Sequence, residues 1–247
     1  MHSDELEATM RRYEAASDRQ VPPDAYMLAR LDGRGFARLA RARLDLELPL
    51  DLRIRDIMIA TADHLMHCGL EVSYAHTQSD EVSLLFHRSE PVRDVQRLAS
   101  RLAGEASAKI TLLLGELASF DCRVFGLPTA ESVVEYFGWR HAEATREALA
   151  AHCRWALRAT GADADAVEDR LREADAADRR GLLGLLGTDF DRLPPWQRHG
   201  AGLHWARTGA PVAALRRRLR VELELPEAGA YAEFVRAQVE QADAPET

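Results

Sequence analysis

Apolar and polar residues alternate along the first 160 residues in runs that predict an ordered series of strands and helices. Short apolar or alternating runs that end at turn residues predict four strands. Apolar positions that recur every three to four residues predict helices around them. The expected strands cover residues 25–31, 70–76, 81–86 and 120–125, and the expected helices cover residues 1–22, 51–68, 91–114 and 130–158.

After the N-terminal helix, the order of these elements is βαββαβ. This is the order of the ferredoxin-like split unit, a class that includes polymerase palms and nucleotidyl cyclases. It predicts an α+β fold in which an antiparallel sheet carries helices on one face. The order alone says little about function, because unrelated activities share such folds.

The last third of the chain has a different pattern. Residues 162–180 are highly charged and helical in character, residues 181–187 indicate a glycine-leucine hinge, and residues 212–224 alternate around arginines as a basic strand would. We therefore expect a palm-like catalytic domain over residues 1–160. A mainly helical C-terminal region over residues 161–247, with a short basic strand, is expected to pack on the same globule.

The composition is that of an ordinary globular protein: of 247 residues, 47% are hydrophobic and 29% are charged, with a net charge of −8. Such an acidic chain does not fit a nonspecific nucleic-acid coat. We expect a cytoplasmic protein with no membrane partner, because no apolar run is long enough for a span and the N-terminus lacks an apolar signal core. Since Lys109 is the only lysine, phosphate contacts would be made by arginines.

Carboxylates stand where the predicted strands end. Asp32 closes the first strand, and Asp80 and Glu81 form the tip of the hairpin between the second and third strands. In the predicted fold, Asp32 and Asp80 should therefore meet at one edge of the sheet. Two close carboxylates repel each other unless a cation neutralises them, and a pair of Mg²⁺ ions about 4 Å apart would suit nucleotidyl transfer. Each aspartate alone is equally typical of a turn.

Basic residues form a stripe on the second helix of the βαββαβ unit. Arg93, Arg97 and Arg101 recur every four residues, with Ser100 beside them, opposite the apolar face. Guanidinium groups in this arrangement can bind a triphosphate in bidentate fashion. A solvated helix face is the alternative, since Glu105 follows Arg101 by four residues and can pair with it.

Four sequence blocks carry a more specific signal through their joint order and spacing. They are residues 30–36 (RLDGRGF), 78–86 (QSDEVSLLF), 120–124 (FDCRV) and 136–144 (YFGWRHAEA). Together with a weaker block at residues 191–200, they resemble the tRNA-histidine guanylyltransferase family and its bacterial and archaeal guanylyltransferase-like branch. The resemblance spans about residues 5–207.

This resemblance implies a palm enzyme that adds nucleotides to the 5′ end of tRNA in the 3′-to-5′ direction, either in tRNA repair or in guanylylation of histidine tRNA. An RNA 5′-monophosphate would be activated by a nucleoside triphosphate, with ATP and GTP as substrates. The 3′-hydroxyl of the incoming nucleotide would then attack it. The family also implies a homo-oligomer, a dimer or a tetramer.

The resemblance also assigns site residues. Asp32, Asp80 and Glu81 would be catalytic, and Asp32, Asp80 and the carbonyl of Gly33 would hold two Mg²⁺ ions. The implied nucleotide-binding residues are Gly33, Arg34, Gly35, Phe36, Ser79, Arg97, Ser100 and Arg101. Three further residues of the blocks are expected to be structural: Asp121, Arg123 and Trp139.

The chain departs from the family pattern at several positions. Residues 144–150 lack the histidine and asparagines of eukaryotic members, Glu143 and Glu147 replace an aspartate and an asparagine, and the family lysine falls near Arg43. These changes favour templated 5′-end repair or extension over specificity for histidine tRNA. Two alternatives stay open: a palm-fold nucleotide cyclase, and a noncatalytic RNA-binding or scaffold protein with a decayed site.

Overall fold

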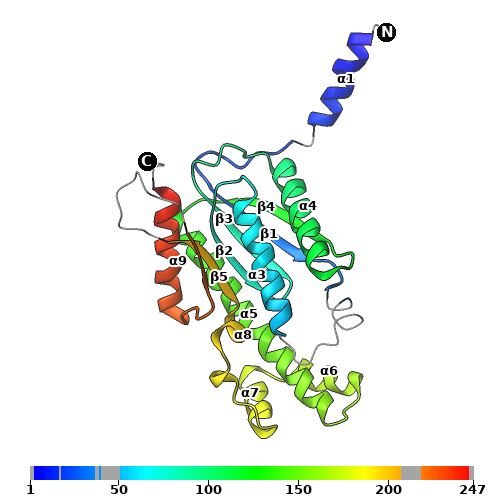
Figure 1. Ribbon diagram of the computed structural model, residues 1–247, viewed down its shortest axis with the longest axis vertical. Coiled ribbons are helices and arrows are strands. Elements are labelled where there is room, and N and C mark those ends of the chain that lie inside the picture. Colours follow the sequence, from blue (N-terminus) through cyan, green and yellow to red (C-terminus); the bar gives the residue numbers. More distant parts are fainter. Residues whose placement is uncertain (1–2, 17, 37–38, 40–50, 207–217, 245–247) are drawn as a thin grey trace.

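A six-stranded antiparallel sheet forms the centre of the molecule (Figure 1). The computed structural model describes residues 3–16, 18–36, 39, 51–206 and 218–244. The strands lie in the order β4-β1-β3-β2-β5-β6, and the first four belong to the βαββαβ unit. Their bounds are β1 Tyr26–Gly33, β2 Val72–Gln78, β3 Glu81–Phe86, β4 Phe120–Leu127, β5 Ala201–Trp205 and β6 Leu219–Glu222.

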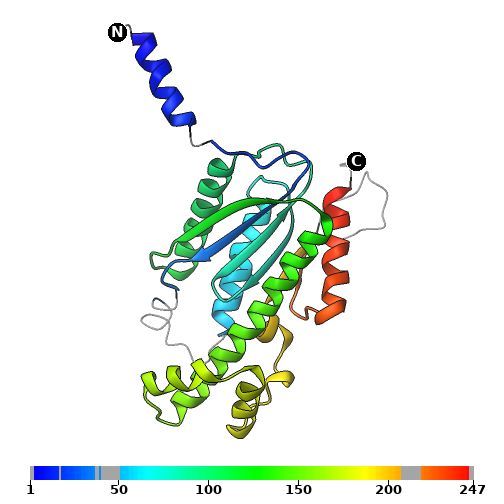
Figure 2. The same ribbon diagram turned by 180° about the vertical axis from the view of Figure 1, so that it is seen from behind.

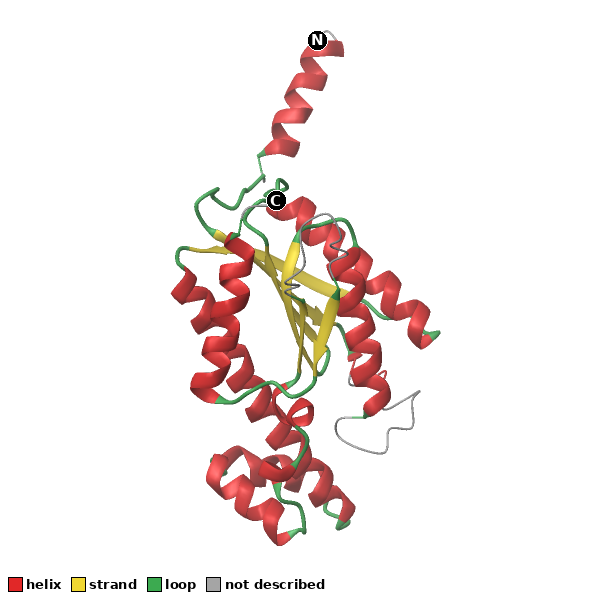
Figure 3. Ribbon diagram, turned by 60° about the vertical axis from the view of Figure 1, so that its left-hand side comes forward, coloured by secondary structure: helices red, strands yellow, loops and turns green. Residues whose placement is uncertain are grey.

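Helices cover both faces of this sheet (Figure 3). Helices α3 and α4 of the βαββαβ unit pack on one face, and α5 and α9 pack on the other. The bounds are α1 Ser3–Ala15, α3 Leu52–His67, α4 Val95–Leu114, α5 Ala130–Ala159, α6 Ala164–Glu173, α7 Ala176–Leu185, α8 Pro195–His199 and α9 Ala228–Asp243. The predicted α+β class is confirmed, but helices on one face describe only α3 and α4 of the βαββαβ unit, because α5 and α9 cover the other face. None of the described helices is long and apolar enough to cross a membrane.

The alternation of side chains along β1 explains the two layers of the core. Ala29 and Leu31 face α3 and α4, whereas Leu28 lies under α5 together with Leu85 of β3. Both faces are therefore apolar where helices cover the strand. On the α5 side of β1, polar residues follow Leu28, first at Arg30 and then at Asp32.

Local sequence signals set the ends of the helices. Helix α3 begins after Asp51 and ends before Gly69, as predicted, and Gly69 has a φ of +79°, which favours glycine. Helix α4 begins at Val95, not at Pro91 as expected. Its N-cap is Asp94, whose carboxylate accepts a backbone N–H of the first turn at 2.6 Å. The N-terminal helix is shorter than expected and projects from the body (Figure 1).

The C-terminal region adds two strands to its helices. Strand β5 pairs with β2 and β6 pairs with β5, so the region continues the sheet. The pattern did not predict β5 because the strand is only five residues long and contains Gly202, which packs against the ring of Tyr74. The predicted hinge at residues 181–187 is wrong, since α7 continues to Leu185. Of the expected basic strand, residues 219–222 form β6, and residues 212–217 lie outside the described residues.

Three buried histidines join α5, α8 and the sheet. The rings of His141 and His199 stack with centroids 4.4 Å apart, and His141 also stacks on Tyr231 at 4.2 Å. The Nε2 atom of His76 donates to the carbonyl oxygen of His199 at 2.8 Å. Burial lowers the pKa of His76 to about 4 and the pKa of His141 to about 3, and it also lowers the pKa of His199. All three side chains are therefore neutral at neutral pH.

We expect this junction to make the protein sensitive to acid. Unfolded histidines titrate near pH 6.5, so between there and about pH 4 the unfolded chain binds more protons than the folded one. The free energy of unfolding is therefore not reduced by these histidines above about pH 6.5, and near pH 5.5 His76 alone should lower it by about 1 kcal/mol. Urea unfolding across this range measures the loss, which His76→Gln should reduce. The exposed His67→Gln is the matched control, and a midpoint that does not change with pH would contradict the prediction.

Candidate active site

The end of β1 and the β2–β3 hairpin meet at one edge of the sheet. Asp32 lies opposite Glu81 in the strand register, and the backbone N–H of Gly33 donates to the carbonyl oxygen of Asp80 at 2.9 Å. A Cβ atom at Gly33 would lie 2.9 Å from the Cβ of Asp80, so only glycine allows this approach. Burial raises the pKa of the Asp80 carboxyl, and the negative charge of Asp32 raises it further. The predicted meeting of Asp32 and Asp80 is therefore present.

The hairpin that carries Asp80 has an unusual backbone. Ser79 is the first residue of a two-residue turn and has a φ of +53°, which a serine adopts at a cost of about 1 kcal/mol. Its Oγ donates to Oδ1 of Asp80 at 3.1 Å. Two residues before Ser79, Thr77 Oγ1 donates to the carbonyl oxygen of Glu81 at 2.9 Å. These bonds fix the turn and hold the Asp80 carboxylate at its tip.

Alternating charges link this edge to α5. Arg30 donates to Oδ1 of Asp32 through Nη2 at 2.6 Å and through Nε at 3.1 Å, and its Nη2 also donates to Glu81 at 2.6 Å. The second oxygen of Glu81 pairs with the buried Arg140, which also donates to Glu143 at 3.2 Å. Both oxygens of Glu81 thus face guanidinium groups. We call Asp32, Arg30, Glu81, Arg140 and Glu143 the charge ladder.

The sequence blocks contained Arg30 and Arg140 but gave them no role. A usable signal was present for each: Arg30 interrupts an apolar strand, and Arg140 lies on the buried side of α5. Glu147, one helical turn after Glu143, adds a further negative charge here. Burial is the main cause that raises the pKa of Glu147, and the negative charges of Glu143 and Asp80 raise it further. Acidic groups from three elements therefore share this edge of the sheet.

Four of the predicted nucleotide-binding residues follow one another here: Gly33 is the last residue of β1, and Arg34, Gly35 and Phe36 lie directly after it. The backbone N–H of Arg34 donates to the carbonyl oxygen of Ser119 at 2.8 Å, and its side chain lies 3.6 Å from Asp121. Gly35 turns the chain with a φ of +66°. Phe36 is a core residue, so its ring packs under the loop and is turned away from solvent.

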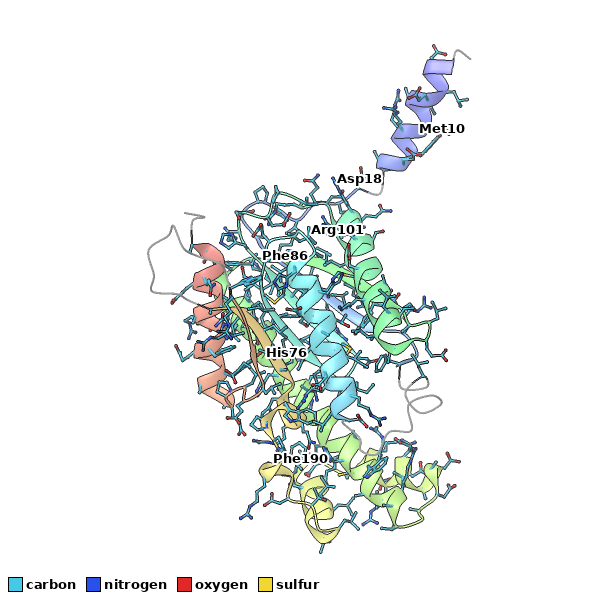
Figure 4. The ribbon with its side chains drawn as sticks, viewed as in Figure 1. Met10, Asp18, His76, Phe86, Arg101 and Phe190 are labelled. Atoms are coloured by element: carbon cyan, nitrogen blue, oxygen red, sulfur yellow. The ribbon has the colours of Figure 1, made fainter. Side chains whose placement is uncertain are left out.

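The predicted arginine stripe on α4 lies elsewhere. Arg101 donates to the carbonyl oxygen of Cys68, just before β2 begins, while Asp80 follows the far end of that strand. At about 3.3 Å per residue, the two ends of β2 are about 20 Å apart. Arg97 and Ser100 lie exposed on the same turns of α4, and Figure 4 shows Arg101 at the end of the sheet where Phe86 lies. Within one chain, these three residues are not brought to the carboxylates.

Arg93, the first arginine of the predicted stripe, also falls outside this site. Arg93 donates to the carbonyl oxygens of Val21, Pro22 and Ala25, so it anchors the segment before β1. Arg43, near which the family lysine would fall, lies outside the described residues.

The two aspartates and Gly33 suit a divalent cation. In the described part of the chain, no three His, Cys, Asp or Glu side chains gather into a metal site. Mg²⁺ commonly takes only one or two carboxylates and completes its shell with phosphate oxygens and water. Arg30 binds Oδ1 of Asp32 and leaves Oδ2 for a cation. A cation would also offset the two effects that raise the pKa of Asp80, which are its burial and the repulsion from Asp32.

Known proteins match this chain in sequence. A family model described as tRNAHis guanylyltransferase matches residues 7–128. The tRNA(His) guanylyltransferase of Neurospora crassa is 28% identical over 196 residues, which are 72% of this chain and 66% of that protein. A probable tRNA(His) guanylyltransferase of Drosophila melanogaster is 28% identical over 196 residues, which are 74% and 68% of the two chains. The chain spans about two thirds of the length of these relatives.

Solved structures share the fold. A bacterial tRNA(His) guanylyltransferase-like protein in complex with ATP has a TM-score of 0.78 at 22% identity, over 97% of this chain and 99% of that chain. Such a protein in complex with GTP has a TM-score of 0.67 at 22% identity, over 95% and 99%. The fold is therefore shared over nearly the full length of this chain and of each of these two structures.

Proposed function

Because the chain belongs to the tRNAHis guanylyltransferase family, we propose that it adds nucleotides to the 5′ end of a tRNA in the 3′-to-5′ direction. One observation carries this proposal: Asp32 and Asp80 meet across Gly33 at the end of the sheet. The replacement of family residues by Glu143 and Glu147 supports repair of truncated tRNA rather than recognition of histidine tRNA.

In this proposal, each residue at the edge has a definite task. Asp32, Asp80 and the carbonyl of Gly33 would hold two Mg²⁺ ions, which would neutralise phosphate oxygens and favour ionisation of the attacking 3′-hydroxyl. Arg30 keeps one oxygen of Asp32 occupied and so fixes the direction of the other. Glu81 fixes Arg30 in turn. The geometry is thus set before substrates bind, which lowers the reorganisation required.

We propose ATP and GTP as the nucleotide substrates, since each is bound by a structurally similar bacterial protein. Arg34 is the predicted phosphate contact at this edge. Its side chain is exposed and 3.6 Å from Asp121, and an exposed ion pair of this kind contributes under about 1 kcal/mol. A phosphate can therefore replace Asp121 as its partner at little cost.

We also propose that the protein acts as a homo-oligomer. The nucleotide-binding residues implied by the resemblance lie at two ends of one sheet, because Arg97, Ser100 and Arg101 are near the start of β2. For them to contact the nucleotide held at Asp80, they would have to come from a neighbouring copy. Sedimentation velocity tests the oligomer directly.

A 5′-extension assay tests the proposed activity. We would incubate a tRNA transcript that lacks its first nucleotide and carries a labelled 5′-monophosphate with Mg²⁺, ATP and all four nucleotides. The expected result is a longer product on a sequencing gel. The same transcript with a 5′-hydroxyl is the control, because it has no phosphate to activate and should not lengthen.

The outcomes separate the proposal from its alternatives. No extension by a folded protein that binds Mg²⁺ and ATP would refute the proposal. Cyclic nucleotide formed from triphosphate without RNA would favour the cyclase. RNA binding without nucleotide binding would favour the scaffold protein.

A further inference from the structure

Part of the sheet face beside the charge ladder has no helix over it. Figure 2 shows α5 crossing the sheet while the ends of β1 and β4 stay uncovered. In the strand register, Arg30 lies opposite Arg123 and Asp32 opposite Asp121. Asp121 and Arg123 of β4 are exposed on this face. Val124 points to the opposite face, where it is buried in the core beneath α4. The uncovered face is therefore polar and accessible next to the proposed catalytic aspartates.

An aromatic wall borders this face. The Tyr136 ring lies 5.3 Å from Phe125 of β4, and its hydroxyl is 3.2 Å from Ser83 Oγ, so Tyr136 spans β1. Trp139 follows one helical turn later, with its ring 5.8 Å from that of Tyr136. The guanidinium carbon of Arg140 lies 4.9 Å from the centre of the Trp139 ring. Arg140 binds Glu81, so Trp139 stands directly beside the charge ladder.

Trp139 and Arg123 both have unused binding capacity. Trp139 is 45% exposed, so a ligand that covered its indole ring would remove apolar surface from water, which is favourable. Arg123 is exposed, and no described carboxylate pairs with it, whereas its neighbour Arg34 pairs with Asp121. Trp139 borders the sheet face on which Arg123 lies, and among the described residues Arg123 has no carboxylate partner. An open aromatic ring and such a guanidinium on one face match the two parts of a nucleotide, which are a base to stack and a phosphate to pair.

We propose that Trp139 and Arg123 form a subsite for the 5′-terminal nucleotide of the acceptor RNA. Its base stacks on the indole and its phosphate pairs with Arg123. A single guanidinium suits one phosphate group, whereas a free triphosphate would require several cations. Stacking also tolerates any base, which an enzyme for RNA ends of varied sequence needs. This assignment rests on the proposed function and replaces the structural role expected for both residues from the sequence.

The subsite can be tested by RNA binding without catalysis. We would measure the fluorescence anisotropy of a tRNA labelled at its 3′ end, with a 5′-monophosphate, in EDTA and without nucleotides. Trp139→Ala should weaken binding about 10-fold, and Trp139→Phe should restore most of the affinity. Trp155→Ala is the matched control, because Trp155 lies on the same helix and is 41% exposed. Circular dichroism confirms that each variant is folded.

Arg123 gives an independent readout. Arg123→Ala should reduce the slope of log Kd against log salt by about 0.7, the value for one single-strand phosphate contact. ATP affinity should be unchanged in both variants. Equal RNA affinity for Trp139→Ala and the native chain, or an equal loss of ATP affinity, would overturn the subsite. RNA binding that depends on Trp139 in a protein without extension activity would refute the proposed function and support the subsite.

Discussion

Asp80→Asn is expected to reduce nucleotidyl transfer about 1,000-fold, because it removes one of the two negative groups that we propose as ligands of the catalytic cations. The asparagine keeps the shape of the side chain and can still accept the hydrogen bond of Ser79 at the turn. The loss should therefore appear in kcat with the fold intact. The 5′-extension assay, run at saturating RNA, measures it.

The stability of the same variant provides a second test. Burial and the charge of Asp32 raise the pKa of Asp80, so its ionised form destabilises the folded protein at neutral pH, and this effect grows as pH rises through that pKa. Asp80→Asn should therefore have an equal or higher Tm. The matched control is Asp121→Asn, an exposed carboxylate on the same sheet face, which should stay active. If Asp80→Asn turned over at the native rate, the proposed catalytic role of Asp80 would be refuted.

Arg140→Ala is expected to destabilise the protein by about 3 kcal/mol, the effect of removing one partner from a buried ion pair. Arg140 is 5% exposed in its side chain and holds both Glu81 and Glu143. Without it, two carboxylates remain together with little water to solvate them. For a chain of this size, the Tm should fall by about 6–12 °C in thermal unfolding.

Arg146→Ala is the control for this prediction. Arg146 lies on the same helix and faces Glu143 at 4.0 Å, but its side chain is 57% exposed. Its removal should change stability by under about 1 kcal/mol. Equal losses of stability in the two variants would contradict the prediction. They would show that any arginine charge near Glu143 has this effect, whether or not the arginine belongs to the charge ladder.

Short-range patterns predicted the elements that hold Asp32 and Asp80, the proposed catalytic carboxylates. The turn between Gln78 and Glu81 and the end of β1 at Gly33 are encoded in a few adjacent residues, so the meeting of Asp32 and Asp80 followed from the strand order. The charge ladder did not follow. Glu81 and Arg140 are 59 positions apart, and their contact depends on the angle at which α5 crosses the sheet.

The arginine stripe shows a related limit of sequence patterns. Helical spacing correctly placed Arg97 and Arg101 on the side of α4 opposite its apolar face. It carried no information about which end of the sheet that part of the helix would reach. Strand β5 was missed for a different reason: a five-residue segment with a glycine at its second position has little periodicity, and its pairing with β2 makes it a strand.

The pairing of β5 with β2 has a consequence for synthesis on the ribosome. Every residue of β2 is buried in the finished protein, yet its outer partner is made more than a hundred residues later. At typical translation rates the nascent chain waits on the order of 10 s with this strand as an open edge. Such an edge is a template for pairing with other chains. Premature termination before residue 201 would leave that edge open for the lifetime of the fragment, so truncated products should be prone to aggregation.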